Sequence, residues 1–316
     1  MDLISEDEFM QRALQVPMQR LHWALAERFG LEVVIRRDDL VDSSLSGNKF
    51  YKLFYNLQQA KSLGHRQVLS FGGAYSNHLH ALAAAGRAAK FKTIAVIRGE
   101  RPRLLSPMLQ DIERWGTQLH FVSRAQYQQK TSCEFAEQLQ SIYGDFYAVP
   151  EGGANVHGAR GAQVMGWALD QRMGGDYTAA CMACGTGNTL AGVAAGMLSA
   201  RSGEPPLAIG FSVLKGEGHL GQNIVSHGEA LGLKAPNWRL LSGYHGGGYG
   251  KKLPGYLQDF ACSFERETGI DFDPVYTLKM CWGVAQLLQQ GYWPRGSRLV
   301  LIHTGGLQGR RALLQS

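Results

Sequence analysis

The chain has 316 residues, a net charge of +6, 45% hydrophobic residues and 18% charged residues. A chain of this size and composition can form a globular core without disulfides or metal ions to hold it together. Its lysines and arginines are scattered instead of forming a stripe with interleaved aromatic residues, which argues against a nucleic-acid-binding protein. The 40 glycines are an excess, and loops that let the backbone approach a ligand are one explanation for it.

The sequence also argues against a membrane or secreted protein. Residues 1–8 are acidic and have no apolar core, so a signal peptide is not expected. Residues 177–200 carry no charge, but the glycine-rich residues 185–189 interrupt them, which predicts a buried strand, a loop and a helix. The five cysteines are odd in number and are not spaced like a disulfide framework. We therefore expect a cytoplasmic protein.

Short β-branched runs alternate with longer helical patterns along most of the chain, which is typical of an α/β protein with mostly parallel sheets. No polar linker separates two independent domains, so we expect two interleaved α/β lobes with a ligand cleft between them, at the carboxyl ends of the strands. The predicted strands are residues 33–35, 67–71, 93–97, 118–122, 146–149, 178–183, 208–213 and 298–303. The predicted helices are residues 48–64, 76–89, 106–115, 134–143 and 159–172.

Four segments combine the pattern of a strand, a glycine-rich turn and a helix start: residues 46–49, 71–78, 184–189 and 303–306. Each would place backbone N–H groups and small hydroxyls at a helix N-terminus, where an anion is favoured. A single turn of this kind is weak evidence, because most such turns only connect two elements. Four of them in one α/β chain favour a ligand site.

The Gly-Thr-Gly-Asn-Thr run at residues 185–189 is the best candidate for a phosphate cradle. It lacks the Gly-Lys-Ser/Thr ending of a P-loop, and Leu190 stands where a dinucleotide fingerprint has its third glycine. A compact phosphate monoester fits better, which points toward a cofactor such as pyridoxal phosphate. This cofactor needs a lysine that bonds to it covalently. Lys49 stands at a helix start, where the helix dipole lowers its pKa; a solvated helix lysine is the alternative.

Several motifs are specific in combination: Gly-Asn-Lys at 47–49, Gly-Gly-x-x-Ser-Asn at 72–77, Gly-Thr-Gly-x-Thr at 185–189, Asp-Pro-Val-Tyr at 273–276 and Gly-Gly at 305–306. With them the chain resembles the 1-aminocyclopropane-1-carboxylate deaminases and D-cysteine desulfhydrases, from Arg36 to Gly306. These are pyridoxal-phosphate enzymes of the tryptophan-synthase-β fold (fold type II). The resemblance implies two interleaved, open, twisted, mostly parallel-sheet domains: a large cofactor-binding domain of residues 1–51 and 156–316, and a small α/β domain of residues 52–155. It also implies a homodimer that acts on a small amino-acid substrate.

The resemblance further implies roles for individual residues. Lys49 matches the lysine that bonds to the cofactor and moves the proton. Asn77 matches the residue that hydrogen-bonds the ring hydroxyl, and Ser76 matches the serine near the substrate carboxylate and the reacting carbon. Tyr249 and Tyr276 match two tyrosines that flank the substrate. The other cofactor contacts that we expect are Asn48, Cys184, Gly185, Thr186, Gly187, Asn188, Thr189, Thr277, Thr304 and Gly305.

Two positions separate the two activities within the resembled family. The deaminases carry a glutamate facing the pyridine nitrogen, where this chain has Thr277, and a leucine where this chain has Thr304. A carboxylate keeps the nitrogen protonated and makes the ring a strong electron sink, which the opening of a cyclopropane requires; expelling a β-thiolate requires less. We therefore expect a lyase that converts D-cysteine to pyruvate, hydrogen sulfide and ammonia. A 1-aminocyclopropane-1-carboxylate deaminase is the first alternative, and a non-catalytic phosphate-ligand-binding protein of the same fold is the second.

The chain departs from the resembled family near the cleft. Phe50 and Tyr51 replace Thr-Arg, and residues 78–80 read His-Leu-His where glutamine, threonine and arginine are common. A larger D-amino acid with a β-leaving group, such as O-acetyl-D-serine or β-chloro-D-alanine, is therefore allowed.

No metal site is expected. Cys181 and Cys184 have the C-x-x-C spacing of a zinc site, but a strand points them to opposite faces, so we predict core packing. His78 and His80 are two apart on a predicted helix and do not share a face.

Overall fold

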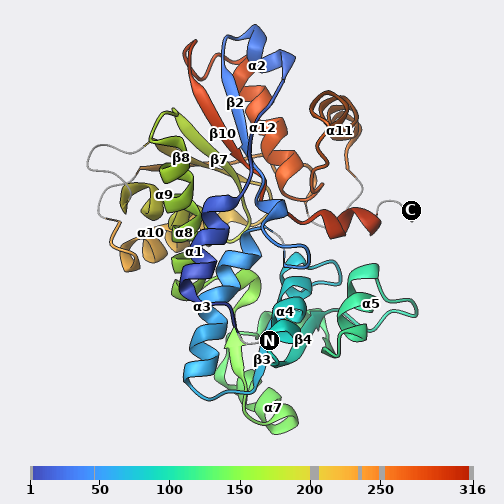
Figure 1. The fold of residues 1–316 in the computed structure, drawn as a ribbon. Coiled ribbons are helices and arrows are strands. Elements are labelled where there is room, and N and C mark those ends of the chain that lie inside the picture. Colours follow the sequence, from blue (N-terminus) through green and yellow to red (C-terminus); the bar gives the residue numbers. More distant parts are fainter. Residues whose placement is uncertain (1–2, 46, 200–205, 234–236, 249–252, 313–316) are drawn as a thin grey trace.

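The computed structural model describes residues 3–45, 47–199, 206–233, 237–248 and 253–312. Two sheets organise these residues (Figure 1), a six-stranded sheet in the order β1-β2-β10-β7-β8-β9 and a four-stranded sheet in the order β5-β4-β3-β6. The six strands of the first sheet are β1 (Met18–Arg20), β2 (Glu32–Arg36), β7 (Ala179–Cys184), β8 (Leu207–Ser212), β9 (Trp238–Leu241) and β10 (Arg298–Ile302). The four strands of the second are β3 (Gln67–Gly72), β4 (Lys92–Arg98), β5 (Gln118–Val122) and β6 (Tyr147–Val149). We call the six-stranded sheet with its covering helices the large lobe, and the four-stranded sheet with its covering helices the small lobe.

Helices connect most of the strands. The α-helices are α1 (Glu6–Gln15), α2 (Ala24–Arg28), α3 (Asn48–Ser62), α4 (Asn77–Ala88), α5 (Pro107–Arg114), α6 (Arg124–Gln128), α7 (Cys133–Tyr143), α8 (Val156–Met173), α9 (Asn188–Ser199), α10 (Leu220–Ala230), α11 (Gly255–Thr268) and α12 (Thr277–Gln289). The short 3₁₀ turns are η1 (Asp38–Leu40), η2 (Glu151–Gly153), η3 (Glu217–His219) and η4 (Leu307–Ala312). Within the described ranges, no helix has both the length and the apolar character that a membrane span requires.

The α/β architecture predicted from the sequence is confirmed. All eight predicted strands are present, and among the described residues every strand pairing is parallel except the one between β1 and β2. The described part of the uncharged segment, residues 177–199, contains β7, a loop and α9, as predicted. Such sheets need helices on both faces because parallel strands are connected by crossovers that pack on them.

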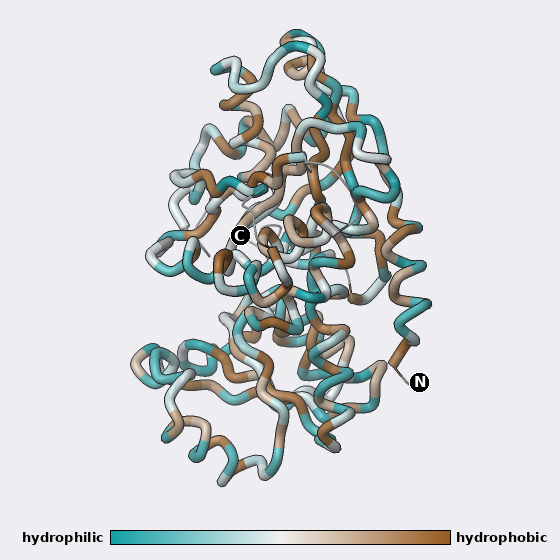
Figure 2. The backbone as a smooth tube through the Cα atoms, turned by 90° about the vertical axis from the view of Figure 1, so that its left-hand side faces the viewer, coloured by the Kyte–Doolittle hydropathy of each residue, from teal (hydrophilic) through white to brown (hydrophobic). Residues whose placement is uncertain are grey.

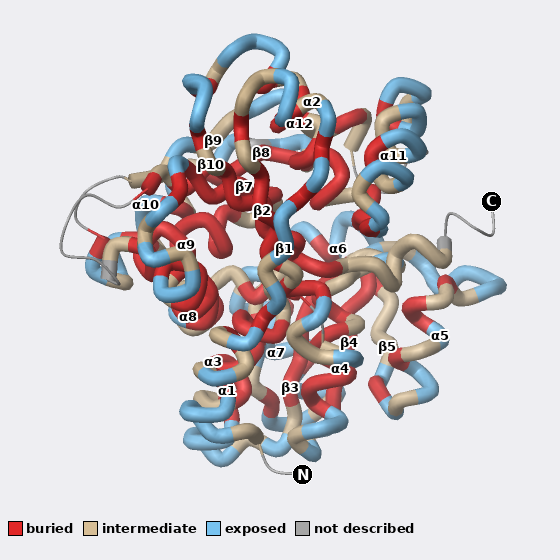
Figure 3. The backbone as a smooth tube through the Cα atoms, turned by 45° about the horizontal axis from the view of Figure 1, so that its top comes forward, coloured by how far each residue is buried: buried red, intermediate tan, exposed pale blue. Residues whose placement is uncertain are grey.

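The large sheet is buried on both faces, as the buried strands at the centre of Figure 3 show. In β10, Val300 and Ile302 face the core formed with α1, α3, α8, α9 and α10, whereas Leu299 and Leu301 face the core formed with α2, α11 and α12. The cysteines of β7 follow the same alternation, because Cys184 belongs to the first core and Cys181 to the second. The prediction that these two cysteines pack in the core on opposite faces is therefore confirmed.

The small sheet is also covered on both faces. Leu69 and Ile94 pack against α6 and α7, whereas Val68 packs against α3 and α4 and Ala95 against α4 and α5. The hydrophobic segments run through the interior of both lobes, and polar segments lie mostly at their outer edges (Figure 2).

Helix α3 belongs to both lobes. Phe50 and Phe54 pack in the core of the large lobe, where the Phe54 ring stacks on Phe9 at a centroid distance of 3.9 Å. Leu53 and Leu57, on another face of the same helix, pack in the core of the small lobe. The predicted domain boundary between residues 51 and 52 falls inside this helix, and the division of the chain into two domains at that point stays a prediction.

Part of the glycine excess serves helix packing and not ligand binding. A Cβ atom on Gly192 would come closer than 3.0 Å to the carbonyl oxygen of Ala159, and one on Gly196 would come equally close to that of Gln163. These contacts join α9 to α8 backbone to backbone, a distance that only glycine allows.

Candidate active site

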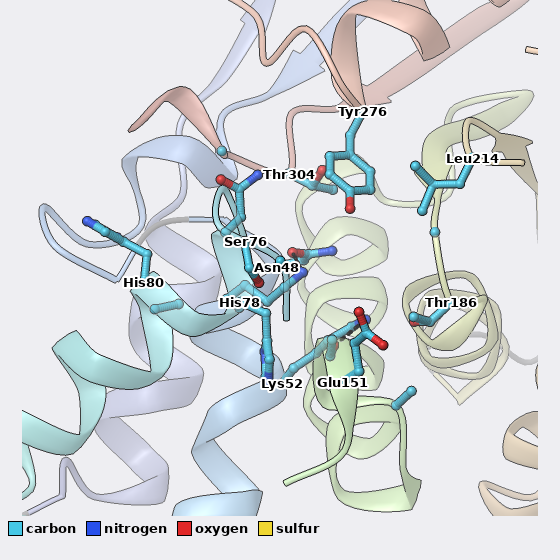
Figure 4. Close-up of a pocket in the computed structure, with 18 of the residues that line it drawn as sticks. Asn48, Lys52, Ser76, His78, His80, Glu151, Thr186, Leu214, Tyr276 and Thr304 are labelled. Carbon is cyan, nitrogen blue, oxygen red and sulfur yellow. Dashed lines mark hydrogen bonds between the residues drawn. The ribbon is translucent and has the colours of Figure 1, made fainter. Parts of the chain in front are cut away.

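A cavity of about 1460 Å³ opens between the two lobes, where the carboxyl ends of β3, β6, β7, β8 and β10 meet the start of α3. The expectation of a cleft at the carboxyl ends of parallel strands is confirmed. Figure 4 shows its walls: Tyr276 and Thr304 lie on one side, Lys52 and Glu151 on the opposite side, and Thr186 beside them.

Most of the predicted site residues line this cavity although they are far apart in the sequence. They are Asn48, Lys49, Ser76, Asn77, Cys184, Gly185, Thr186, Gly187, Thr189, Tyr276, Thr304 and Gly305. Tyr249, the fourth residue expected to take part in catalysis, lies outside the described residues.

The structure does not bring Asn188 and Thr277 to the cavity. Asn188 is fully buried, and its Nδ2 donates to the carbonyl oxygens of Gly153 at 2.7 Å and Asn155 at 3.0 Å. Thr277 is fully buried, and its Oγ1 accepts from the backbone N–H of Asp273 at 2.9 Å. Thr277 stands in the first turn of α12, where a short polar side chain bonds to nearby backbone groups, whereas Asn188 bonds to the backbone of a distant segment. The expected contact of the Thr277 hydroxyl with a ring nitrogen in the cavity is therefore not supported by the structure, whereas Thr304 does line it.

Lys49 lies in the first turn of α3 and reaches into the cavity. Its Nζ donates to Asn48 Oδ1 at 2.9 Å, and Asn48 Nδ2 donates to Thr189 Oγ1 at 3.0 Å. Burial lowers the pKa of Lys49 from 10.5 to about 8, although the nearby Asp273 carboxylate acts in the opposite direction. The predicted direction of the shift is right, and its main cause is loss of water around the ammonium. A lysine with this pKa is in part an unprotonated nucleophile at neutral pH.

The start of α3 is held against the end of β10. Gly47, which precedes α3, has φ +70° and donates its N–H to the carbonyl oxygen of Asp38 at 2.8 Å. The Asn48 N–H donates to the carbonyl oxygen of Thr304 at 3.2 Å. The turn that leads into α3 at Gly47 does not follow a strand directly, because β2 ends at Arg36 and η1 intervenes. The strand that supports this turn is thus β10, from the other end of the chain.

Residues 185–187 form the predicted cradle between β7 and α9. Gly187 has φ +81°, and a Cβ atom on it would lie 2.7 Å from Ile224 Cγ1. A Cβ atom on Gly185 would lie 3.1 Å from the ring of Tyr276. The first N–H groups of a helix have no partner within the helix, so α9 presents donors at this point. The geometry suits a phosphate group.

Lys52 is a cavity residue that the sequence analysis did not single out. It follows Lys49 by one helical turn, is 2% exposed, and its Nζ donates to the carbonyl oxygen of Gly152 at 3.3 Å. Burial, together with the nearby Lys49 ammonium, lowers the pKa of Lys52 well below its ordinary value. A buried ammonium without a carboxylate partner is unfavourable until an anion binds beside it. The i,i+3 spacing from Lys49 was the signal that could have identified it.

His78 lines the cavity and is neutral. Its Nε2 lies 2.8 Å from Ser70 Oγ, and Ser70 Oγ donates to the carbonyl oxygen of Val149 at 2.6 Å. The serine proton is used in that bond, so His78 Nε2 must be the donor. Burial and the nearby lysines hold the pKa of His78 well below its ordinary value. His80 also lines the cavity, but it lies 3.5 Å from Asp111 and against Trp115, so the two histidines do not share a face, as predicted.

A comparison with known protein families decides the identity of this site. The family profile described as pyridoxal-phosphate dependent enzyme matches residues 12–305 of the chain. The chain belongs to this family. Its cofactor is pyridoxal phosphate, and the glycine cradle, the helix start and the two cavity lysines fit a phosphate and an aldehyde in one cavity.

Similar proteins narrow the family further. A Pyrococcus horikoshii protein, named provisionally as a 1-aminocyclopropane-1-carboxylate deaminase, is 30% identical over 298 residues, which cover 93% of this chain and 90% of that protein. The mitochondrial bifunctional D-cysteine desulfhydrase/1-aminocyclopropane-1-carboxylate deaminase of Arabidopsis thaliana is 28% identical over 302 residues, 89% of this chain and 73% of that protein. This pyridoxal-phosphate enzyme is therefore a member of the deaminase/desulfhydrase family.

The fold of this enzyme is also found among solved structures. A crystal structure of a 1-aminocyclopropane-1-carboxylate deaminase homologue superimposes with a TM-score of 0.80 and 27% identity, covering 99% of this chain and 100% of that one. The two sheets thus form the fold of type II pyridoxal-phosphate enzymes, as the resemblance implied.

Proposed function

We propose that this enzyme is a lyase that eliminates the β-substituent of a D-amino acid, most simply D-cysteine, and releases pyruvate, ammonia and hydrogen sulfide. The observation that carries the proposal is the presence of Thr304, a threonine that is 8% exposed, in the cavity wall. Neither position 277 nor position 304 has the acidic side chain that would keep a ring nitrogen protonated. A hydroxyl supports the weaker electron sink that β-elimination requires.

When bound, pyridoxal phosphate supplies an electron sink for negative charge on the carbon beside the amino group of the substrate. Lys49 Nζ, whose pKa is about 8, accepts the proton from that carbon. Asn48 Oδ1 holds the lysine amine in place through their 2.9 Å hydrogen bond. Ser76 and the first N–H groups of α4 face the cavity and bind the substrate carboxylate. Tyr276 covers the opposite side of the cavity.

Deamination of 1-aminocyclopropane-1-carboxylate is the second candidate. It is favoured by the names of the relatives, since the Pyrococcus protein carries this name and the Arabidopsis protein carries both. The two activities use the same lysine and cradle, so the substrate must be tested directly.

The test measures pyruvate release from D-cysteine, L-cysteine and 1-aminocyclopropane-1-carboxylate by the purified enzyme, with Lys49→Ala as the inactive control. Turnover of D-cysteine alone supports the proposal. Turnover of the cyclopropane substrate favours the second candidate. Bound cofactor with no turnover of these or of other D-amino acids with β-leaving groups contradicts both and leaves a binding protein.

We also propose that the chain forms a homodimer. The proposal follows from the resemblance to the family and from the prevalence of symmetric dimers among soluble oligomers. Light scattering of the purified protein at two concentrations tests it, and the mass of a single chain at both would contradict it.

A further inference from the structure

Three polar side chains form a chain of hydrogen bonds beside the cavity. Gln308 Nε2 donates to Asn77 Oδ1, and Asn77 Nδ2 donates to Asp273 Oδ2 at 3.4 Å. Asn77 and Gln308 line the cavity, whereas Asp273 lies behind them and is 1% exposed. The three residues come from the start of α4, from η4 and from the turn before α12, so the chain joins both lobes.

Asp273 is held in place by its own turn. Its Oδ1 accepts from the backbone N–H groups of Val275 at 3.0 Å and Tyr276 at 2.6 Å. These bonds leave Oδ2 to face Asn77. Lys49 of α3, Lys279 of α12 and Arg310 of η4 are the cationic groups near this carboxylate.

An ionised carboxylate only accepts hydrogen bonds, and this fixes the orientation of the whole chain. Asn77 must turn its NH₂ group toward Asp273, so its oxygen faces Gln308. Gln308 must then also present its NH₂ group, and its Oε1 is left buried without a partner among the described residues. A buried amide oxygen without a donor costs free energy. The direction of the chain is therefore set by Asp273.

The second glycine of the pair at 305–306 gives these side chains room. A Cβ atom on Gly306 would lie 2.6 Å from Asn77 Nδ2 and 2.8 Å from Asp273 Oδ2. Any other residue at this position would push the amide and the carboxylate apart.

We propose that Asp273 is a positioning residue, which forces Asn77 to act as a hydrogen-bond donor toward the ring oxygen of pyridoxal phosphate and so favours the ionised form of that oxygen. The inference rests on the contact with the ring hydroxyl that the family resemblance implies for Asn77. Burial raises the pKa of Asp273 to about 6, which leaves the carboxylate ionised at pH 7.5 to 8.

Asp273→Asn is the decisive variant because it can reverse the chain without breaking it. An asparagine keeps an oxygen for the N–H groups of Val275 and Tyr276 but turns an NH₂ group toward Asn77. Asn77 then turns its oxygen toward residue 273, and Gln308 turns its unpartnered oxygen toward the Asn77 amide. The hydrogen bonds between the three side chains are kept with their direction reversed, so the variant should fold. The matched control is Asp271→Asn, which removes a neighbouring, exposed carboxylate that pairs with Arg310.

The experiment measures the affinity of the apoprotein for pyridoxal phosphate and for the analogue that has hydrogen in place of the ring hydroxyl. We expect Asp273→Asn to weaken binding of pyridoxal phosphate by about tenfold to hundredfold and to leave binding of the analogue unchanged. Asp271→Asn should change neither. Equal weakening of both ligands, or no weakening, would overturn the proposal.

Asn77→Ala provides a second variant in case Asp273→Asn does not fold. It should lose the same preference for pyridoxal phosphate over the analogue, and retention of the preference would overturn the proposal. A wild-type protein that binds pyridoxal phosphate but releases no pyruvate from any amino acid contradicts the proposed function and leaves this inference intact.

Discussion

Gly47 and Thr304 meet backbone to backbone: a Cβ atom on Gly47 would overlap the carbonyl oxygen of Thr304. Because Gly47 also has φ +70°, Gly47→Ala would strain the backbone, and its methyl group would overlap the Thr304 carbonyl. We expect it to lower the free energy of unfolding by more than about 3 kcal/mol and to displace Lys49. The control is Gly64→Ala at the other end of α3, where φ is +80° and no atom lies within 4 Å of the added Cβ. Urea denaturation should show that the control loses about 1–2 kcal/mol of the free energy of unfolding. Equal losses in the two variants would contradict the close approach of Gly47 to the Thr304 carbonyl.

The pKa of Lys49 predicts its reactivity in the apoprotein. Burial disfavours the ammonium, so the neutral amine becomes the main form above about pH 8 instead of above 10.5. The rate at which an amine-selective acylating reagent modifies Lys49 should therefore reach half its maximum near pH 8. Mass spectrometry of the labelled peptide measures this rate, with Lys49→Ala to assign the peptide. A half-maximum near 10.5 would show that the cavity does not desolvate this lysine.

Lys52→Met should affect stability and cofactor binding in opposite directions. Removal of a buried ammonium that has no carboxylate partner among the described residues should raise the melting temperature of the apoprotein. Loss of the same charge beside the cradle should weaken the affinity for pyridoxal phosphate by at least about tenfold. Thermal unfolding and a cofactor titration test both changes, with Lys61→Met, at an exposed position of the same helix, as control. If Lys52→Met leaves the affinity unchanged, this lysine does not contact the phosphate.

The two threonines that we connected with the ring nitrogen should behave differently when each is replaced by valine. Thr277→Val removes the bond to the backbone of Asp273 and should lower the free energy of unfolding by about 1–3 kcal/mol. Thr304→Val removes a hydroxyl from the cavity wall and should lower kcat by about tenfold with little change in stability. Chemical denaturation and steady-state kinetics distinguish the two. If only Thr277→Val lowers kcat, and does so at unchanged stability, the Thr277 hydroxyl acts in the cavity after all.

The sequence predicted the central elements of the fold because they combine buried apolar runs with amphipathic helices. It missed β1 and β9, which are three- and four-residue strands at the edges of the large sheet and carry almost no pattern. The glycine excess was attributed to ligand loops, but Gly192 and Gly196 allow close contact between two helices. A glycine in a ligand loop can be distinguished from a glycine at a helix contact only when its packing partner is known.

The candidate site was predictable where its residues are contiguous, as in the motifs at 47–49 and 185–189. The contacts of Asn77 with Asp273 and Gln308 were not predictable, because more than 190 residues separate Asn77 from either partner along the chain. Thr277 was assigned to the cavity from its place in a motif, whereas its hydroxyl bonds to the backbone of its own turn. Local competition for hydrogen bonds decides such cases, and it is not visible in a motif.

The position of β10 in the large sheet has a consequence for the synthesis of the protein. During translation β2 and β7 are synthesised first, whereas β10, the strand that lies between them in the sheet, consists of residues 298–302 and is synthesised near the end. Until that strand emerges, the sheet exists as two separate pieces, and the carbonyl of Thr304 is not present to receive the start of α3. Folding that proceeds from the N-terminus during translation therefore cannot complete the cavity. The nascent chain therefore has no complete cavity that could bind the cofactor, and the cofactor binds only once nearly the whole sequence has been translated.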